Sequence, residues 1–278
     1  MPTRDETWPN GTPCWVDVTV NDPTAARAFY SALFGWDIQE GPPEMGGYSM
    51  CMLNGRPAAA ISPKQAGDTT PNAWSTYLAA DDVDDAVTRA QAAGGSFPMA
   101  TMDVMTFGRM TVGMDPTGAA YCIWQAGDHK GVGVYNEPGA LIWNELMTRD
   151  YEGAKAFYGA VFGYEYDEIG DGTNFQYSTI KRSDGEIVAG LGAMGAEVLA
   201  EMAPQWTTYF SVVDADATAA KAAELGATIQ NEPWDTPHGR MAVIQGPQGE
   251  VFSIMQNLPQ DDTALASTQT STETSTGA

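Results

Sequence analysis

The sequence has few cysteines and no long apolar run. Its three cysteines, Cys14, Cys51 and Cys122, show no CxxC spacing, so we expect neither a disulfide framework nor a cysteine zinc site. No stretch approaches the roughly 20 apolar residues that span a bilayer. The polar start MPTRDETWPNG lacks the basic and apolar regions of a secretory signal. These absences predict a soluble, cytoplasmic protein.

Basic residues are also scarce. The chain has 13 Lys and Arg against 36 Asp and Glu, which gives a net charge of −23. Such a polyanion repels nucleic acids and anionic lipid surfaces, so we expect neither as a partner. The acidity fits a solubility surface, adaptation to salt, or attraction of cationic ligands, and composition alone leaves all three open.

An internal repeat is the strongest signal that is present. Residues 14–36 and 142–164, compared at a shift of 128, are identical at nine of 23 positions. The shared residues include the aromatic pairs Trp15/Trp143, Phe29/Phe157, Tyr30/Tyr158 and Phe34/Phe162. The similarity resumes between 73–86 and 205–218, and between 108–125 and 239–256. The repeat therefore predicts two tandem domains over 10–127 and 137–257.

Outside the repeat lie a linker and a tail. The linker GDHKGVGVYNEPG is rich in Gly and polar residues. The last segment, 259–278, ends in a stretch where eight of the ten residues 267–276 are Ser or Thr, so we expect it to be disordered.

Within one copy the pattern predicts a strand, a helix and three strands, repeated once. Residues 14–20 alternate as a half-buried strand. Asp22-Pro23 then starts a helix whose apolar stripe continues to Phe34, and Gly35 ends it. Shorter strands are expected at 36–40, 47–53 and 57–62. A second unit follows, with a strand from Trp74 to Ala80, a helix capped near Asp82 and ended at Gly94-Gly95, and strands near 96–101, 108–113 and 119–125. Each half is thus an α+β domain of two βαβββ modules, four in the chain.

These modules resemble the vicinal-oxygen-chelate superfamily, which includes glyoxalases, bleomycin-resistance proteins and extradiol dioxygenases. The resemblance rests on the paired modules, the "D…A..FY..LFGW" helix, the "DVDDA" helix start and the "GR…DPTG" hairpin. The tandem form is similar to a group of actinobacterial proteins described as glyoxalase-like, as hydroxylases or as secreted mycobacterial antigens. The resemblance implies two cups, each formed by a curled sheet with helices outside and the ligand inside.

The superfamily's metal-using members bind a divalent metal through residues on the first, fifth and eighth strands of a domain. Carried over by the helix caps and turns, these positions are Trp15, Ser75 and Cys122 in the first copy. In the second copy they are Trp143, Thr207 and Ser253. None of the six is His, Gln, Asp or Glu, so we expect no metal and no other cofactor.

The resemblance implies that large side chains face the cups instead. They are Trp15, Tyr77 and Trp124 in the first, and Trp143, Tyr209 and Met255 in the second. Two interpretations stay open: the side chains fill an unused cavity, or they wall a pocket that stacks on flat or cationic ligands. The second cup looks less filled because Thr207 and Ser253 are small.

Each first strand also carries an inward acid, Asp17 or Glu145, two residues after its Trp. Burial should raise the pKa of this acid and fit it for general base catalysis. A structural ion pair with Arg109 or Arg240, at equivalent places on the seventh strands, is the favoured alternative. His238 is a further catalytic candidate, and it lies in a turn close to Arg240.

Two functions follow. The preferred one is a metal-independent protein, monomer or homodimer, that binds a small organic molecule in an aromatic-walled cup. The alternative is a glyoxalase-like lyase, isomerase or hydrolase that acts on a small carbonyl compound with Asp17 or Glu145 as general base. A metal-dependent glyoxalase or ring-cleaving dioxygenase is disfavoured, because both need the metal to polarise oxygen.

Overall fold

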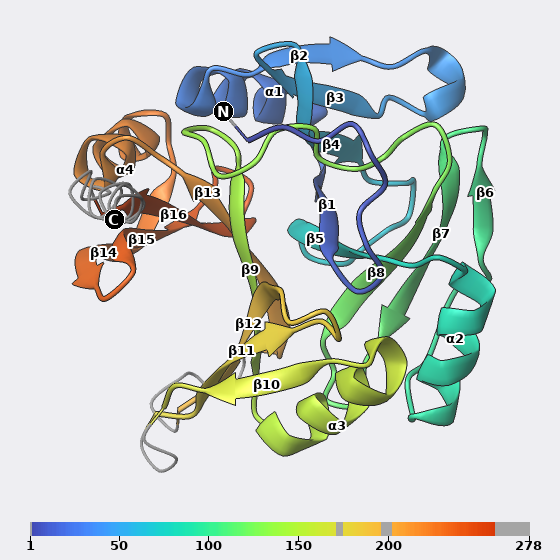
Figure 1. Cartoon of the computed structure of the whole chain (residues 1–278). Helices are drawn as coiled ribbons and strands as arrows, with labels where there is room; N and C mark the ends of the chain where they lie inside the picture. The colour runs from blue at the N-terminus through green and yellow to red at the C-terminus, as the bar shows by residue number, and fades with distance from the viewer. Residues whose placement is uncertain (1, 171–174, 196–201, 259–278) are drawn as a thin grey trace, which may run out of the picture.

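The computed structural model describes residues 2–170, 175–195 and 202–258 (Figure 1). Its elements form the four βαβββ modules that the sequence predicts. The first comprises β1 (Pro13–Val20), α1 (Pro23–Phe34), β2 (Asp37–Glu40), β3 (Ser49–Leu53) and β4 (Arg56–Pro63), with a 3-10 turn at Pro43–Met45. The second comprises β5 (Ala73–Ala79), α2 (Val83–Ala92), β6 (Met102–Val104), β7 (Gly108–Met114) and β8 (Ala120–Ala126).

The second half repeats this order. Its first module comprises β9 (Leu141–Thr148), α3 (Tyr151–Phe162), β10 (Glu165–Glu168), β11 (Tyr177–Lys181) and β12 (Ile187–Ala193). The last module comprises β13 (Gln205–Ser211), α4 (Ala215–Glu224), β14 (Thr228–Thr236), β15 (Gly239–Gln245) and β16 (Val251–Asn257). The predicted tail at 259–278 lies outside the described residues.

Each half forms one curled eight-stranded sheet. The strand order is β2-β3-β4-β1-β5-β8-β7-β6 in the first and β10-β11-β12-β9-β13-β16-β15-β14 in the second. In each sheet the first strands of the two modules, β1 with β5 or β9 with β13, run antiparallel side by side at the centre. We call the face of the first sheet that carries Trp15 and Asp17 the first cup. The second cup is the face of the second sheet that carries Trp143 and Glu145.

Local sequence explains where the helices begin and end. The Asp22 carboxylate accepts a hydrogen bond from the Ala25 N–H at 3.0 Å, Pro23 opens α1, and Gly35 ends it with a φ of 73°. Asp150 and Gly163 do the same for α3. These boundaries match the predicted ones because caps act over one turn of chain.

One predicted strand was misplaced. Instead of a strand at 96–101, Ser96 makes an isolated bridge with Met114, and β6 begins only at Met102. Pro98 lies between the two, and a proline has no N–H to donate to a sheet. The pairing with β7 is therefore interrupted for several residues.

The two sheets face each other through the sides away from the cups. The Asn144 amide of β9 donates to Thr76 Oγ1 of β5 at 2.9 Å and to Thr208 Oγ1 of β13 at 3.4 Å. Helices also meet across the halves, α1 with α4 and α2 with α3. The cups therefore lie on opposite sides of a shared interior.

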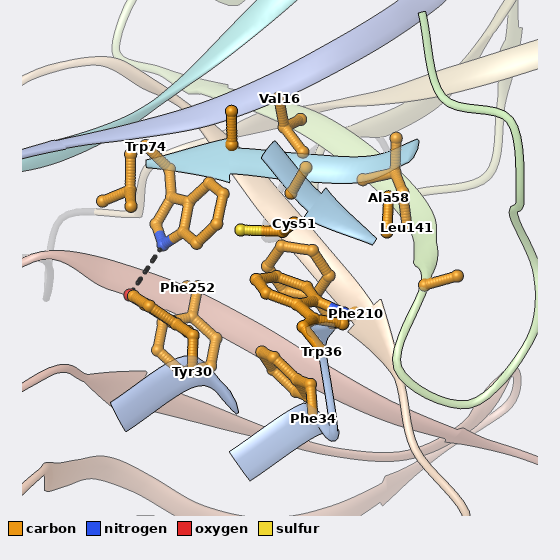
Figure 2. Packing of buried hydrophobic residues seen from close by; sticks show 14 of the residues in the cluster. Val16, Tyr30, Phe34, Trp36, Cys51, Ala58, Trp74, Leu141, Phe210 and Phe252 are labelled. Atoms are coloured by element: carbon orange, nitrogen blue, oxygen red, sulfur yellow. Dashed lines mark hydrogen bonds between the residues drawn. The ribbon is translucent and has the colours of Figure 1, made fainter. Parts of the chain in front are cut away.

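Aromatic side chains from both halves fill this interior (Figure 2). Tyr30, Phe34 and Trp36 of the first half pack against Phe210 and Phe252 of the second. All five side chains are at least nine-tenths buried. Burial of this much aromatic surface strongly favours a fixed arrangement of the two halves.

In each half, a buried tyrosine hydroxyl also donates a hydrogen bond to an acid of the other half. Tyr30 accepts a hydrogen bond from Trp74 Nε1 at 3.2 Å and donates to Glu250 Oε1 at 2.9 Å. In the second half Tyr158 accepts from Trp206 Nε1 at 2.9 Å and donates to Asp115 Oδ2 at 3.0 Å. Both acids lie in the turn before the last strand of the other half.

Within the described residues, no helix is long and apolar enough to cross a membrane.

The tyrosine hydroxyls should contribute measurably to stability. Replacing Tyr30 with Phe leaves the Trp74 N–H and the buried Glu250 carboxyl each without this partner, so the free energy of unfolding should fall by about 1–3 kcal/mol. Tyr121→Phe is the matched control, because the Tyr121 hydroxyl is buried and has no hydrogen-bond partner in the described part of the chain. Urea denaturation of both variants tests this, and equal effects would contradict it.

Candidate functional site

Strand alternation places the predicted inward residues of β1 on one face. Val16, Val18 and Val20 pack in the interior with α1, while Trp15 and Asp17 lie on the opposite face. The register sets Trp15 beside Tyr77 of β5, and Tyr77 beside Cys122 of β8. The second cup repeats this row with Trp143, Tyr209 and Ser253.

In the first cup two tyrosines hold the acid. Asp17 Oδ2 accepts the Tyr77 hydroxyl at 2.8 Å and the Tyr48 hydroxyl at 3.1 Å. Trp15 Nε1 donates to the oxygen of Tyr48 at 2.9 Å. Burial raises the pKa of Asp17 to about 6, although hydrogen bonds from Tyr77, Tyr48 and Ser75 favour the charged form.

The second cup contains the same network. Glu145 Oε1 accepts the Tyr209 hydroxyl at 2.5 Å, and Oε2 accepts the Tyr177 hydroxyl at 2.9 Å. Trp143 Nε1 approaches the oxygen of Tyr177 at 3.3 Å. Burial again raises the pKa of Glu145, and the two tyrosine hydrogen bonds lower it by less. The duplicated network of one tryptophan, two tyrosines and one acid is the main feature of both cups.

One tyrosine of each network, Tyr48 or Tyr177, was not among the residues predicted from the sequence. A signal was available, because the dipeptides Tyr48-Ser49 and Tyr177-Ser178 recur at a shift of 129, close to that of the helices. The two dipeptides lie at the starts of β3 and β11, which are equivalent strands of the two copies.

The two cups differ in how open they are. Trp15 and Asp17 are each only 3% exposed, whereas Trp143 and Glu145 are partly exposed. In the first cup the imidazole of His129, from the linker, stands against Trp15 with ring centroids 4.3 Å apart. The candidate site is therefore the second cup, where Trp143 and Glu145 are accessible.

A cavity of about 420 Å³ lies beside the start of β9. It is formed by the N-terminal segment, the linker, β9 and the turn between β11 and β12, and its lining includes Trp8, Tyr135, Arg182 and Trp143. Trp143 thus lines this cavity and also contacts the tyrosine that holds Glu145.

Met255 lies on the same face of the second sheet as Ser253, and Trp124 lies on the same face of the first as Cys122.

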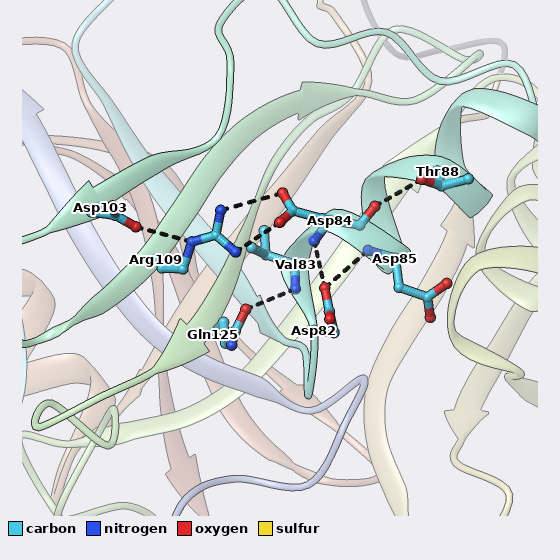
Figure 3. Close-up of polar contacts among 8 residues, drawn as sticks. All are labelled: Asp82, Val83, Asp84, Asp85, Thr88, Asp103, Arg109 and Gln125. Carbon is cyan, nitrogen blue, oxygen red and sulfur yellow. Dashed lines mark hydrogen bonds and ion pairs between the residues drawn. The ribbon is translucent and has the colours of Figure 1, made fainter.

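Arg109 does not reach Asp17, contrary to the favoured expectation. It pairs across β7 and β8 with Gln125, and both side chains lie on the helix-covered face. Its guanidinium binds Asp84 at the start of α2 at 2.8 Å and Asp103 of β6 at 2.9 Å (Figure 3). Neighbouring residues of a strand point to opposite faces, so Met110, and not Arg109, shares the face of Trp124. The expectation therefore placed Arg109 on the wrong face of the sheet.

Arg240 and His238 are also away from Glu145. Arg240 pairs with Asp216 of α4 and Asp235 of β14, which copies the Arg109 arrangement. His238 is exposed in the turn between β14 and β15, where its N–H donates to Thr236 Oγ1 at 3.2 Å. The expected ion pairs of the inward acids are therefore replaced by tyrosine hydroxyls.

The residues of the cups do not fit the metal that the superfamily resemblance implies. The register puts Tyr77 and Tyr209, rather than Ser75 and Thr207, level with the first-strand tryptophans. In residues 2–170, 175–195 and 202–258, no three His, Cys, Asp or Glu side chains gather into a group that could hold a metal ion. A divalent metal needs three or four such ligands.

Comparisons with known proteins agree with this fold. The family model for the Glyoxalase/Bleomycin resistance protein/Dioxygenase superfamily matches the chain twice, at residues 14–123 and 140–254. A Mycobacterium bovis protein, CFP32, provisionally named a glyoxylase, is 43% identical over 94% of this chain and 100% of its own length. The anthracycline biosynthesis protein DauV of Streptomyces sp. strain C5 is 36% identical over 88% of this chain and 93% of its own.

Among solved structures, the Mn(II)-bound glyoxalase from Novosphingobium aromaticivorans superposes with a TM-score of 0.60. The alignment covers 89% of this chain and 83% of that one at 16% identity, a likeness that extends to the fold alone. With both halves matched by one family model, the chain belongs to the glyoxalase, bleomycin-resistance and dioxygenase superfamily as a tandem of two such domains.

Proposed function

We propose that this protein binds a small, flat organic molecule in its second cup without a metal. The observation that carries the proposal is Glu145, a partly exposed acid held by Tyr177 and Tyr209. Trp143 connects this acid to the neighbouring cavity. An aromatic wall with one anchored polar group is the usual composition of a small-molecule site.

The chemistry of the cup favours a particular kind of ligand. The indole of Trp143 offers a face or edge to a flat ring. The Glu145 carboxylate, in partly desolvated surroundings, attracts a cationic or hydrogen-bond-donating group. The net charge of −23 would raise the local concentration of cationic compounds around the protein. A flat molecule with a donor or cationic substituent satisfies all three features.

The relatives support this choice of ligand. DauV and a second relative, DnrV of Streptomyces peucetius, are named for anthracycline biosynthesis. Anthracyclines are flat fused-ring compounds that carry an amino sugar, so they combine the two features that the cup favours. We therefore propose an aromatic polycyclic compound as the ligand class.

Glu145 also supports a second candidate function, catalysis on a small carbonyl compound. Its pKa is raised and it is accessible, which are the properties of a general base that removes a proton next to a carbonyl group. The glyoxylase name of CFP32 points in the same direction. Binding is preferred, because among the described residues the hydrogen-bond partners of Glu145 include no positively charged group that could stabilise a developing oxyanion.

We further propose that the protein acts in the cytoplasm as a monomer or homodimer, and that its domains extend over 10–127 and 137–257.

Metal content gives the first test. Protein purified without chelator should contain no stoichiometric Fe, Mn, Ni, Co or Zn, because the described residues of the cups include no ligand set for them. Elemental analysis measures this directly, and EDTA should leave the melting temperature unchanged. One tightly bound metal ion per domain would contradict the proposal.

The second test uses daunorubicin, a fluorescent anthracycline, as the probe. Glu145→Gln should weaken its binding by about 1–2 kcal/mol, or roughly 5–30-fold, because one charged hydrogen bond is lost. Trp143→Ala should weaken it at least as much through lost stacking and burial. Fluorescence anisotropy titrations measure both values.

Asp17→Asn is the matched control for this test, since it makes the same change in the closed cup. It should leave daunorubicin affinity unaltered. Equal losses for the Asp17 and Glu145 variants, or no binding by the unaltered protein, would refute the second cup as a site for this ligand class. Turnover of methylglyoxal that falls about 100-fold in Glu145→Gln would instead favour the catalytic function.

The buried acid of the first cup should make stability depend on pH. The pKa of Asp17 is raised from 3.8 to about 6, so the folded protein holds this proton in a range where the unfolded chain has lost it. Stability from this group is therefore fully present below pH 3.8 and is lost as the pH rises through 6, by about 3 kcal/mol in total. Asp17→Asn should remove this fall.

Denaturant titrations at pH 4, 5, 6 and 7 compare the two proteins, with the exposed Asp37→Asn as control. A constant difference between the unaltered protein and Asp17→Asn at all four pH values would show that Asp17 does not titrate in this window.

A further inference from the structure

A cavity of about 420 Å³ lies where the N-terminal segment, the linker and the second half meet. Its lining includes residues before β1 and residues of the linker, and both segments lie outside the family matches at 14–123 and 140–254. Ile142 and Asn144 of β9 also line it, and by strand alternation they lie on the face away from Trp143 and the second cup. The cavity therefore adjoins the second cup at Trp143, but the N-terminal segment and the linker give it walls that neither concave sheet face has.

Arg4 places one positive charge on the wall of this cavity. Its guanidinium carbon stands 4.8 Å from the centroid of the Trp8 ring. Its Nε donates to the Glu6 carbonyl at 3.0 Å, and its Nη2 donates to the Thr7 carbonyl at 2.6 Å. In the part of the chain that the structure describes, these contacts leave its Nη1 without a hydrogen-bond partner and its charge without a carboxylate partner. An arginine held in this way by a ring and by backbone carbonyls is available to an anion.

Arg182 adds a second positive charge, from the turn between β11 and β12. Its side chain is only 13% exposed. The Nη1 group donates to Thr12 Oγ1 at 2.7 Å, which joins the turn to the N-terminal segment, and Nε donates to Asp184 Oδ1 at 3.2 Å. A guanidinium has five N–H donors, so its contacts with Thr12 and Asp184 do not use all of them. Two of the chain's 13 basic residues thus line one cavity.

The rest of the lining is mainly apolar or aromatic. The rings of Trp8 and Tyr135 meet edge to face, with centroids 5.2 Å apart and an interplanar angle of 71°. Trp8 is also held by the linker, because its Nε1 donates to the Val132 carbonyl at 3.2 Å. Ile187 is 52% exposed, an apolar surface that a ligand would cover. Aromatic and apolar walls with a few polar groups are typical of a small-molecule site.

We propose that this cavity binds a flat aromatic molecule that carries a carboxylate, with the ring against Trp8 and Tyr135 and the carboxylate held by Arg4 and Arg182. The two oxygens of a carboxylate match the planar fork of a guanidinium. Elsewhere the net charge of −23 repels anions, so the two arginines also make this place selective. The site is additional to the proposed function of the second cup and does not depend on it.

The test uses 2-naphthoate as the probe and 2-naphthamide as its neutral isostere, each titrated into the full chain by isothermal calorimetry. The acid should bind with a Kd of about 10 μM to 1 mM, the range expected for a ligand of this size. The amide should bind at least about tenfold more weakly, because it lacks the charged hydrogen bonds to arginine. Added salt should weaken binding of the acid more than that of the amide.

Single substitutions place the site. Arg4→Gln and Arg182→Gln should each weaken 2-naphthoate binding by about 5–30-fold. Glu186→Gln should strengthen it by about two- to fivefold, because an exposed carboxylate of the lining no longer repels that of the ligand. Arg56→Gln is the matched control, since it removes the same charge from an ion pair with Asp5 but does not line the cavity. It should leave the affinity within about twofold of the unaltered protein.

Three outcomes would overturn the proposal: no binding of 2-naphthoate, equal affinity for the acid and the amide, or equal effects of Arg4→Gln and Arg56→Gln. If Arg182→Gln does not fold, because its contact with Thr12 is lost, Arg4→Gln and Glu186→Gln decide the question. Glu145→Gln should leave 2-naphthoate binding unaltered, and Arg4→Gln should not weaken binding of daunorubicin to the second cup. Either proposal can therefore fail alone.

Discussion

The structure depends on the contact between the backs of the two sheets. In each half one buried tyrosine, Tyr30 or Tyr158, donates its hydroxyl hydrogen bond to an acid in the last turn of the other half. Around these bonds the helices and aromatic side chains of both halves share one interior. A buried hydrogen bond to an acid is costly to leave unpaired, so it fixes where one half sits on the other. As a result both cups face outward.

The two cups share one hydrogen-bond network and differ mainly in how exposed its side chains are. The acid differs by one methylene between Asp17 and Glu145, and each accepts hydrogen bonds from two tyrosines. Access differs because the linker folds over the first cup and brings His129 to its tryptophans. The linker thus makes the first cup the more enclosed of the two.

Arg109 and Arg240 form ion pairs with aspartates outside the cups. Arg109 and Arg240 each join the first turn of a helix to the neighbouring hairpin through two aspartates. These exposed ion pairs contribute little stability individually. They place two of the chain's few positive charges beside the carboxylates at helix N-termini. The acids of the cups instead accept hydrogen bonds from neutral tyrosine hydroxyls.

Sequence alone determined the features that act over short distances or recur. The repeat gave two domains, and the caps Asp22 and Gly35 gave the helix boundaries, because a cap involves only neighbouring backbone groups. Alternation along β1 gave the inward faces of Trp15 and Asp17. Tertiary structure alone decided that Tyr77 of β5 and Tyr48, which precedes β3, hold Asp17, and that His129 of the linker closes one cup. Both depend on strand register and chain path, which bring together residues tens of positions apart that no local pattern relates.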